Sequence, residues 1–210
     1  MFRSQKEFEI QLEQLKSFSS PSVKLEQYPT PAKIAAEWMW GMALRGEVQG
    51  KIVLDAGCGG GILGIGALLL GAKKVFFVDK DETALEIAKE NYNAVKKEYK
   101  VGKAEFFCVD ITQFAQKVDV VVQNPPFGTK EAHADKKFLE KAFSLAPVVY
   151  SMHKSSTKKF VEAISKDFGF WITHHWEYAF PIKAVFKFHE KPVKRIEVGL
   201  WKMEKKRMIL

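Results

Sequence analysis

Cysteine is scarce in this sequence and long apolar runs are absent, which excludes several classes of protein. Only Cys58 and Cys108 occur among 210 residues, so there is neither a disulfide framework nor a zinc-finger spacing. No apolar stretch approaches the roughly 20 residues of a membrane helix. The first residues, MFRSQKEFEIQ, lack the apolar core of a secretion signal. We therefore expect a cytoplasmic protein that is not embedded in a membrane and holds no metal.

An excess of positive charge is the main feature of the composition. Lys and Arg number 33 against 25 Asp and Glu, which leaves a formal net charge of +8. Such an excess favours a polyanionic partner, because cations placed against phosphates gain affinity by releasing counterions. A Lys- and Glu-rich solvated surface from a heat-adapted organism explains the same charge equally well.

Short apolar strands alternate with amphipathic helices through most of the chain. This alternation is typical of an α/β fold, in which a mostly parallel sheet is covered by helices on both faces. The tail alternates with a period of two and indicates an antiparallel pair. The expected strands are 51–57, 74–79, 104–110, 118–127, 148–153, 171–180 and 195–203, and the expected helices between them are 62–71, 81–95, 135–146 and 156–167.

Two more amphipathic segments, residues 4–18 and 32–45, come before the first strand and are expected to be helical. We therefore expect residues 1–45 to form an N-terminal helical extension that contributes to the binding pocket. Residues 46–210 would form the Rossmann-like α/β domain.

Polar residues stand at the carboxyl ends of four successive predicted strands, namely Asp55, Asp79, Asp110 and Asn124. Open parallel sheets bind their ligands beyond that edge. Each residue taken alone is better explained as a helix or turn cap, because Asp and Asn favour that position. The four together favour a binding edge.

A glycine-rich segment, DAGCGGG, begins at Asp55 and leads into a helix. Glycines allow a tight turn and a close approach to a ligand, and the helix N-terminus supplies free N–H groups. Gly59, Gly61 and Gly64 also satisfy the dinucleotide pattern G-x-G-x-x-G, so an oxidoreductase is an alternative. A carboxylate at Asp55 would repel a pyrophosphate, but it suits the cationic aminoacyl part of S-adenosylmethionine.

Asp79 and Asp110 extend the predicted pocket. Asp79 could accept both ribose hydroxyls of a nucleotide, which suits NAD and S-adenosylmethionine alike. Asp110 could accept a hydrogen bond from the adenine amino group of the cofactor. The alternative for Asp110 is a cap on the Ile-Thr-Gln-Phe turn that comes next in the chain.

The segment Asn124-Pro125-Pro126-Phe127 favours one class of reaction. An aryl amine is a poor nucleophile because its lone pair is delocalised into the ring. Two fixed acceptors, the Asn124 side-chain oxygen and the Pro125 carbonyl, could draw that lone pair out of conjugation. The prolines stiffen the loop, and Phe127 offers a flat face on which a base can stack. These four residues are the predicted catalytic group for methyl transfer to an amine.

Together with the glycine segment, these residues resemble the amino-methyltransferases of adenine, cytosine and glutamine. The segments LEQYPTP, DAGCGGGILGIG, ALEIAKEN, NPPFGTK, VVYSMHKSST and FKFHEK resemble the methyltransferase-like protein five family, over residues 24–200. The resemblance implies a class I methyltransferase fold with a seven-stranded sheet and one antiparallel C-terminal strand. It also implies transfer from S-adenosylmethionine to adenosine N6 in small-subunit ribosomal RNA.

The resemblance assigns further residues to the cofactor pocket. Besides Asp55, Asp79 and Asp110, the cofactor-binding set is Gln27, Tyr28, Thr30, Gly57, Gly59, Gly60 and Ile62. Tyr28 could equally be an ordinary packing aromatic.

Several residues are candidates for contact with RNA. His153 and Lys154 come at the end of the fifth strand, and Lys154 could meet a phosphate. The alternative there is that Ser155 or Ser156 caps the next helix. The basic stretch 183–195 could line an RNA channel.

The family resemblance also implies a protein partner, a small zinc-binding activator. An apolar third-strand edge near Phe106, Phe107 and Phe114 could accept its strand. Three alternative functions remain open: a release-factor glutamine N5-methyltransferase, a DNA adenine methyltransferase and a non-catalytic RNA-binding scaffold.

Overall fold

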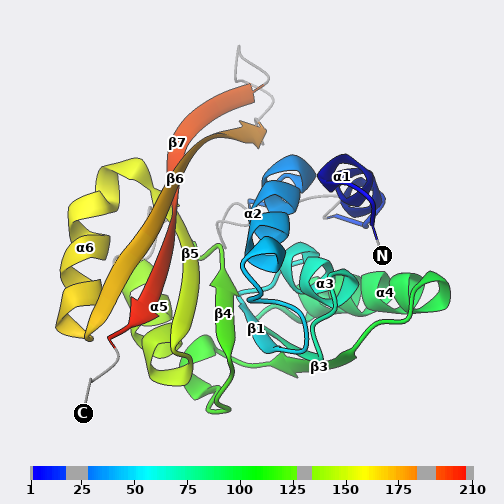
Figure 1. Ribbon diagram of the computed structural model, residues 1–210, viewed down its shortest axis with the longest axis horizontal. Helices are drawn as coiled ribbons and strands as arrows, with labels where there is room; N and C mark the ends of the chain where they lie inside the picture. Colours follow the sequence, from blue (N-terminus) through cyan, green and yellow to red (C-terminus); the bar gives the residue numbers. More distant parts are fainter. Residues whose placement is uncertain (1, 18–27, 127–133, 184–192, 207–210) are drawn as a thin grey trace.

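The chain folds around one seven-stranded sheet (Figure 1). The computed structural model describes residues 2–17, 28–126, 134–183 and 193–206. Within them the strand order is β3-β2-β1-β4-β5-β7-β6. The strands are β1 (Ile52–Ala56), β2 (Lys74–Asp79), β3 (Lys103–Cys108), β4 (Val120–Gln123), β5 (Val148–Lys154), β6 (Phe170–Lys183) and β7 (Val193–Lys205).

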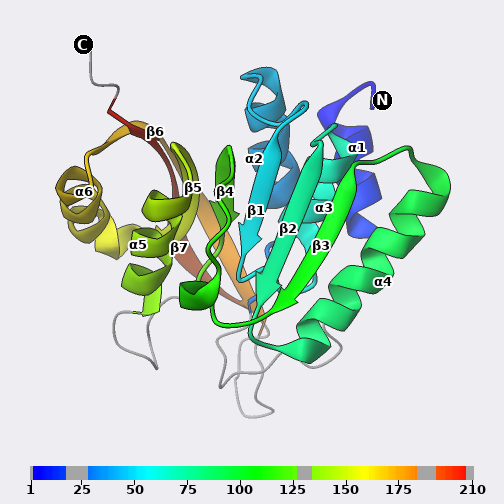
Figure 2. The ribbon, with the colours of Figure 1, turned by 90° about the horizontal axis from the view of Figure 1, so that it is seen from below.

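Five neighbouring strands, β3 through β5, run parallel, and β7 is antiparallel to both β5 and β6. The predicted fold is therefore confirmed, including the antiparallel C-terminal strand. Figure 2 shows the arrowheads of β1, β2 and β3 pointing toward one edge of the sheet. That edge carries the carboxyl ends of the parallel strands, where sheets of this kind bind ligands.

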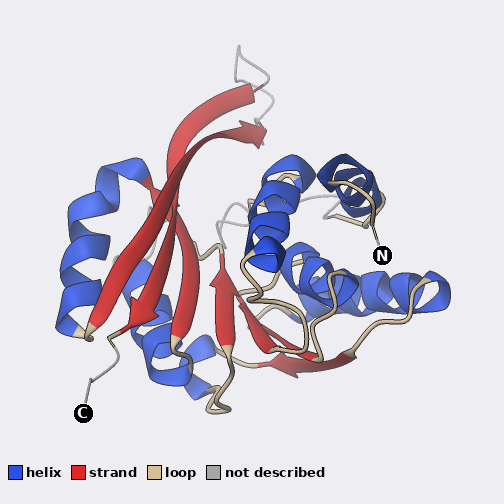
Figure 3. Cartoon of the chain, in the orientation of Figure 1, coloured by secondary structure: helices blue, strands red, loops and turns tan. Residues whose placement is uncertain are grey.

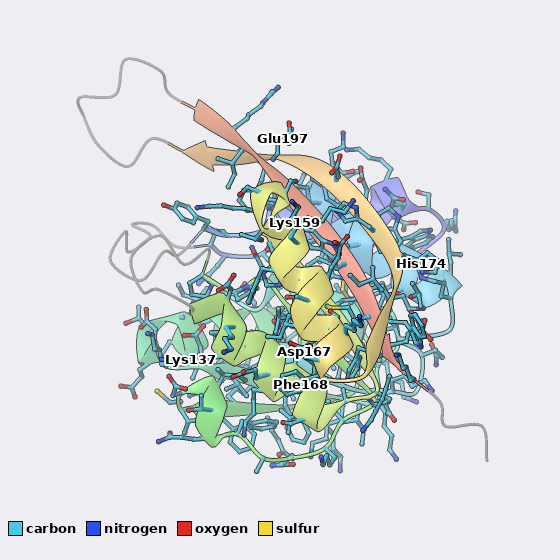
Figure 4. The ribbon with its side chains drawn as sticks, turned by 90° about the vertical axis from the view of Figure 1, so that its left-hand side faces the viewer. Lys137, Lys159, Asp167, Phe168, His174 and Glu197 are labelled. Carbon is cyan, nitrogen blue, oxygen red and sulfur yellow. The ribbon has the colours of Figure 1, made fainter. Side chains whose placement is uncertain are left out.

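Helices cover both faces of the sheet (Figure 3). One face carries α1 (Gln5–Glu13), α2 (Ala32–Leu44), α3 (Ile62–Leu69) and α4 (Glu82–Glu98), and the other carries α5 (Ala134–Leu145) and α6 (Lys158–Asp167). Figure 4 looks onto α6, which lies across β6 and β7 between Lys159 at one end and Asp167 and Phe168 at the other.

The strands bury side chains on both faces, which explains their near-continuous apolar sequences. In β1, Val53 packs into the core under α1 to α4, and its neighbour Leu54 packs into the core under α5 and α6. Phe8 and Leu12 of α1 are buried in the first of these cores. The N-terminal helices therefore belong to the same packed body as the sheet.

Some element boundaries differ from those predicted. The first helix ends at Glu13 and not near residue 18, and β4 ends at Gln123 and not at residue 127. Pro125 and Pro126 come after β4, and proline has no N–H to donate to a strand ladder. A 3₁₀ turn, Ser155–Thr157, separates β5 from α6. None of the described helices combines the length and apolarity needed to span a bilayer.

The aromatic residues of β3 pack inward more than the sequence suggested. Phe106 stacks on Phe77, with ring centroids 4.8 Å apart, and Phe107 meets Phe76 edge-on at 5.9 Å. Phe114 is only 3 % exposed. The phenyl rings therefore pack in the two cores. At the edge of β3 it is chiefly the backbone N–H and C=O groups that remain available to another strand.

Candidate active site

The strand order brings three of the predicted site residues to the middle of one edge. Asp55 lies in β1, Asp79 ends β2 and Asn124 comes directly after β4. Although β4 comes after β3 in the chain, it pairs with β1, and Gln123 is in register with Ala56. This crossover places Asn124 beside the glycine segment. Asp110 lies two residues beyond β3, at the edge of the sheet.

Two carboxylates accept hydrogen bonds from backbone N–H groups of the glycine segment and of the helix that follows it. The Gly59 N–H donates to Asp79 Oδ2 at 2.8 Å, and the Gly64 N–H donates to Asp55 Oδ2 at 2.8 Å. Gly59 has a φ of 53°, in the left-handed region that favours glycine. A Cβ on Gly64 would lie 2.3 Å from the Phe77 ring, so only glycine fits there.

Asp55 is buried, at 1 % exposure, and Asp79 is half-buried. Burial raises the pKa of Asp55 to about 8; the Gly64 N–H partly offsets this, and the nearby Asp79 adds to it. Burial also raises the pKa of Asp79. Among the described residues, no Lys, Arg or His forms an ion pair with either acid. A cationic ligand is what such a pair of acids would favour.

The amide of Asn124 is held in one orientation. Its Nδ2 donates to Thr30 Oγ1 at 3.0 Å and lies 3.5 Å from the Tyr28 carbonyl oxygen. Because a carbonyl can only accept, it requires the NH₂ side of the amide to face it. Oδ1 therefore points the other way, and it is buried with no partner among the described residues. A buried acceptor without a donor is costly unless a ligand completes it.

The remainder of the predicted catalytic group is only partly described. Pro125 is buried and Pro126 is half-buried. Phe127 and Gln27 lie outside the described residues, as does most of the basic stretch 183–195. Their predicted roles in stacking, cofactor binding and RNA contact stay predictions.

Asp110 forms the cap that was the alternative to a cofactor contact. Its Oδ1 accepts from the Thr112 N–H at 2.9 Å and from Thr112 Oγ1 at 2.6 Å, and the hydroxyl bond followed by the backbone bond lowers the pKa of Asp110. The side chain is exposed. A carboxylate has further lone pairs, so the cap leaves the predicted adenine contact open.

The remaining predicted cofactor residues surround the glycine turn. Gly57 comes directly after β1, and Ile62 opens α3. The Gly60 carbonyl oxygen accepts from Asn91 Nδ2 at 2.9 Å. Asn91 also pairs through its side chain with the backbone of Lys16, at 2.8 and 3.0 Å. Sequence reasoning missed Asn91; the only signal was its place in the segment ALEIAKEN, where the spacing on α4 turns it toward the core.

His153 and Lys154 occupy different environments. His153 is 1 % exposed, because its position on β5 turns the ring into the interior, and its predicted contact with substrate stays a prediction. Lys154 ends β5 and is half-buried. Ser155 Oγ is buried without a partner in the described part of the chain, and it caps neither the 3₁₀ turn nor α6.

Comparison with known proteins agrees with this geometry. The curated rRNA N(6)-adenosine-methyltransferase METTL5 of Danio rerio is 36% identical over 200 residues, covering 92% of this chain and 95% of that protein. The Drosophila melanogaster relative of the same description is 35% identical over 95% of both chains. The chain belongs to the METTL5 family.

A solved structure has a similar fold over nearly the whole chain. A crystal structure from Pyrococcus horikoshii, provisionally described as an RNA methyltransferase, has 40% sequence identity and a TM-score of 0.87, covering 97% of this chain and 98% of that one. The family model for ribosomal protein L11 methyltransferase (PrmA) matches residues 37–125 only. That match spans the glycine segment and ends inside the NPPF turn. The METTL5 relatives confirm the predicted family, and the PrmA likeness covers less than half of the chain.

Proposed function

We propose that this chain transfers a methyl group from S-adenosylmethionine to N6 of an adenosine in ribosomal RNA. The observation that carries the proposal is Asn124, whose amide is locked by Thr30 and Tyr28 so that a buried Oδ1 faces away from both without a donor among the described residues. An exocyclic amino group is a donor that fits this acceptor. The METTL5 relatives carry the same activity in their descriptions.

The residues present also fit the cofactor. S-adenosylmethionine supplies a methyl group on a sulfonium, whose leaving group is already activated. Asp55 is buried and Asp79 is half-buried beside the glycine turn, and two acids there favour a ligand that carries positive charge. Both oxygens of Asp79 already accept backbone N–H groups, from Gly59 and Asp81, but each retains a lone pair for a ribose hydroxyl.

The chain itself contributes positioning and fixed dipoles. Asn124 Oδ1 and the Pro125 carbonyl would accept the two N–H bonds of the target amine, so that its lone pair leaves conjugation with the ring and faces the methyl donor. As methyl transfer proceeds, the nitrogen becomes positively charged, and the same two oxygens stabilise that charge. The proton then released from nitrogen passes to solvent.

Labelled methyl transfer to deproteinised ribosomal RNA, with nucleoside analysis of the product, tests this function. We expect N6-methyladenosine. Asn124→Ala should lower kcat by about 100-fold or more, the effect of removing a preorganised transition-state contact, and leave S-adenosylmethionine affinity nearly unchanged. Asn93→Ala, on the exposed face of α4, is the matched control. Label in a glutamine side chain of a release factor, or in DNA but not RNA, would replace the proposal with the corresponding alternative function.

The small-subunit RNA is proposed as the substrate on the family resemblance. Methylation of purified small-subunit RNA and not large-subunit RNA is the expected result.

We also propose that the protein works in the cytoplasm, as its free thiols Cys58 and Cys108 suggest. The N-terminal segment 1–45 would complete the cofactor pocket, on the strength of the Thr30–Asn124 and Lys16–Asn91 contacts.

A zinc-binding activator is proposed to dock on β3. Of the described strands, β3 pairs only with β2, so its outer backbone can accept a strand from another chain. Hydrogen exchange of residues 103–108 should slow when the activator is added to the purified protein. Unchanged exchange there, together with full activity of the isolated chain, would rule out this docking mode.

A further inference from the structure

The two ends of the catalytic turn are held by residues that converge on one buried imidazole. Gln123 ends β4 and directly precedes Asn124. Asp135 stands in the first turn of α5, on the other side of the turn in sequence. His153, on the neighbouring strand β5, contacts Asp135 directly and Gln123 through Ser151. The ring is 1 % exposed, and its described contacts are with Ser151, Asp135 and Trp201.

The contacts form a continuous chain. Gln123 Nε2 donates to Ser151 Oγ at 2.9 Å, and Ser151 Oγ lies 2.6 Å from His153 Nε2. On the other side of the ring, His153 Nδ1 lies 3.8 Å from Asp135 Oδ2. Gln123 and Ser151 are 0% exposed and His153 is 1% exposed, so water does not compete for the two bonds that join Gln123, Ser151 and His153.

The donors and acceptors allow one consistent assignment. Because Gln123 donates to Ser151 Oγ, the serine hydrogen can point to His153 Nε2, which then accepts. The remaining ring proton is on Nδ1 and faces Asp135. Burial lowers the pKa of His153, which keeps the ring neutral. Burial is the largest single influence on Asp135 and opposes its ionisation. The contact with His153 and the backbone N–H groups of Asp135 and Lys136 together outweigh it, so the pKa of Asp135 lies below its usual value.

Packing keeps the imidazole from turning. Trp201 of β7 meets the His153 ring edge-on, with centroids 5.7 Å apart and planes at 62°. His175 of β6 also packs on Trp201, stacked at 4.6 Å. His175 therefore supports the same tryptophan, but none of its described contacts reaches Gln123, Ser151 or Asp135. The two histidines offer a matched comparison.

We propose that His153 is a positioning residue for methyl transfer, which holds the segment bearing Asn124 from both of its ends. The inference rests on the proposed function of that segment. A buried polar chain adds little net stability compared with an apolar core of the same shape. Its effect is to fix β4 and the start of α5 relative to each other, which sets where Asn124 and Pro125 meet the target amine.

Replacement of the imidazole by a ring of similar size tests the proposal. We expect His153→Phe to lower kcat by about 10- to 100-fold, the effect of a small misplacement of reacting groups, while the affinity for S-adenosylmethionine stays within twofold. Hydrogen exchange of peptides covering 118–126 and 134–138 should accelerate. His153→Gln, whose amide can accept from Ser151 and donate to Asp135, should recover part of kcat. His175→Phe should leave kcat and both peptides near wild type.

Each other outcome has a definite meaning. Wild-type kcat and exchange in His153→Phe, or an equal loss in His175→Phe, would overturn the positioning role. Should His153→Phe fail to fold, Asp135→Ala decides, because it keeps the ring and removes the acceptor that faces Nδ1; unchanged kcat and exchange there contradict the proposal. A wild-type protein that methylates no RNA refutes the proposed function instead, and the exchange measurements still test whether His153 holds the turn.

Discussion

The amide of Asn124 is oriented by Tyr28 and Thr30, which lie 96 and 94 residues earlier in the chain. The sequence alone points to this residue and predicts its chemistry. It cannot supply the direction in which Oδ1 points, because that depends on donors and acceptors from a distant segment. The same is true of His153, which the sequence offered as a surface contact and the fold turned inward.

The buried Asp55 predicts a pH-dependent stability of the ligand-free protein. Burial raises its pKa from 3.8 to about 8. Between those two pH values the folded state keeps a proton that the unfolded chain has lost, so this carboxyl makes folding less favourable as pH rises. The slope is at most about 1.4 kcal/mol per pH unit for one proton. Above pH ~8 the penalty is constant.

Asp55→Asn removes this titration and can still accept from the Gly64 N–H. Chemical denaturation at pH 5, 6, 7 and 8 should show the wild type losing stability relative to the variant at each step. Saturating S-adenosylmethionine should shrink the difference, because a bound cation stabilises the charged form. Parallel pH profiles for the two proteins would show that Asp55 is ionised throughout.

At the scale of elements, most boundaries are explained by local chemistry. Asp81 opens α4 by accepting from the Thr83 N–H at 3.0 Å, and two prolines end β4. Helices and strands were therefore predictable where capping and periodicity act alone. The first helix is shorter than the predicted 4–18, because a tertiary contact determines where it ends. The backbone of Lys16 pairs with the side chain of Asn91 and is therefore not helical.

The contacts of Asn91 predict that the N-terminal segment and the glycine turn are coupled. One side chain, 2 % exposed, binds both the Lys16 backbone and the Gly60 carbonyl. Asn91→Ala should weaken S-adenosylmethionine binding by about 5- to 30-fold, the loss of one to two buried hydrogen bonds at roughly 1 kcal/mol each. In kinetics, KM for the cofactor should rise more than kcat falls.

Glu90→Ala is the control for this coupling. It removes only the exposed ion pair between Glu90 and Lys16, at 2.9 Å, and exposed pairs contribute little. Isothermal titration calorimetry should give wild-type affinity. Equal affinities for the Asn91 and Glu90 variants would mean that the turn needs no support from α4.

At the scale of the whole molecule, the net charge of +8 predicts electrostatic binding of RNA, because relatives in the family are described as rRNA methyltransferases. Binding of a single-stranded ribosomal RNA fragment should weaken as salt rises, with log affinity falling linearly against log salt by about 0.7 for each phosphate contact. Lys154→Gln, at the end of β5, should reduce that slope by about 0.7. Lys89→Gln, on the exposed face of α4, should leave it unchanged. A flat salt dependence would favour the solvated-surface explanation.

The sequence by itself determined the α/β class, and it predicted the edge at which ligands bind and the chemistry of the NPPF turn. These depend on residue type, period and spacing, which are local properties. Only the tertiary structure decided that β4 inserts beside β1, that Asn124 Oδ1 is left without a donor among the described residues and that His153 is buried. Those facts depend on which distant segments pack together, and that packing depends on contacts throughout the chain and not on any one local pattern.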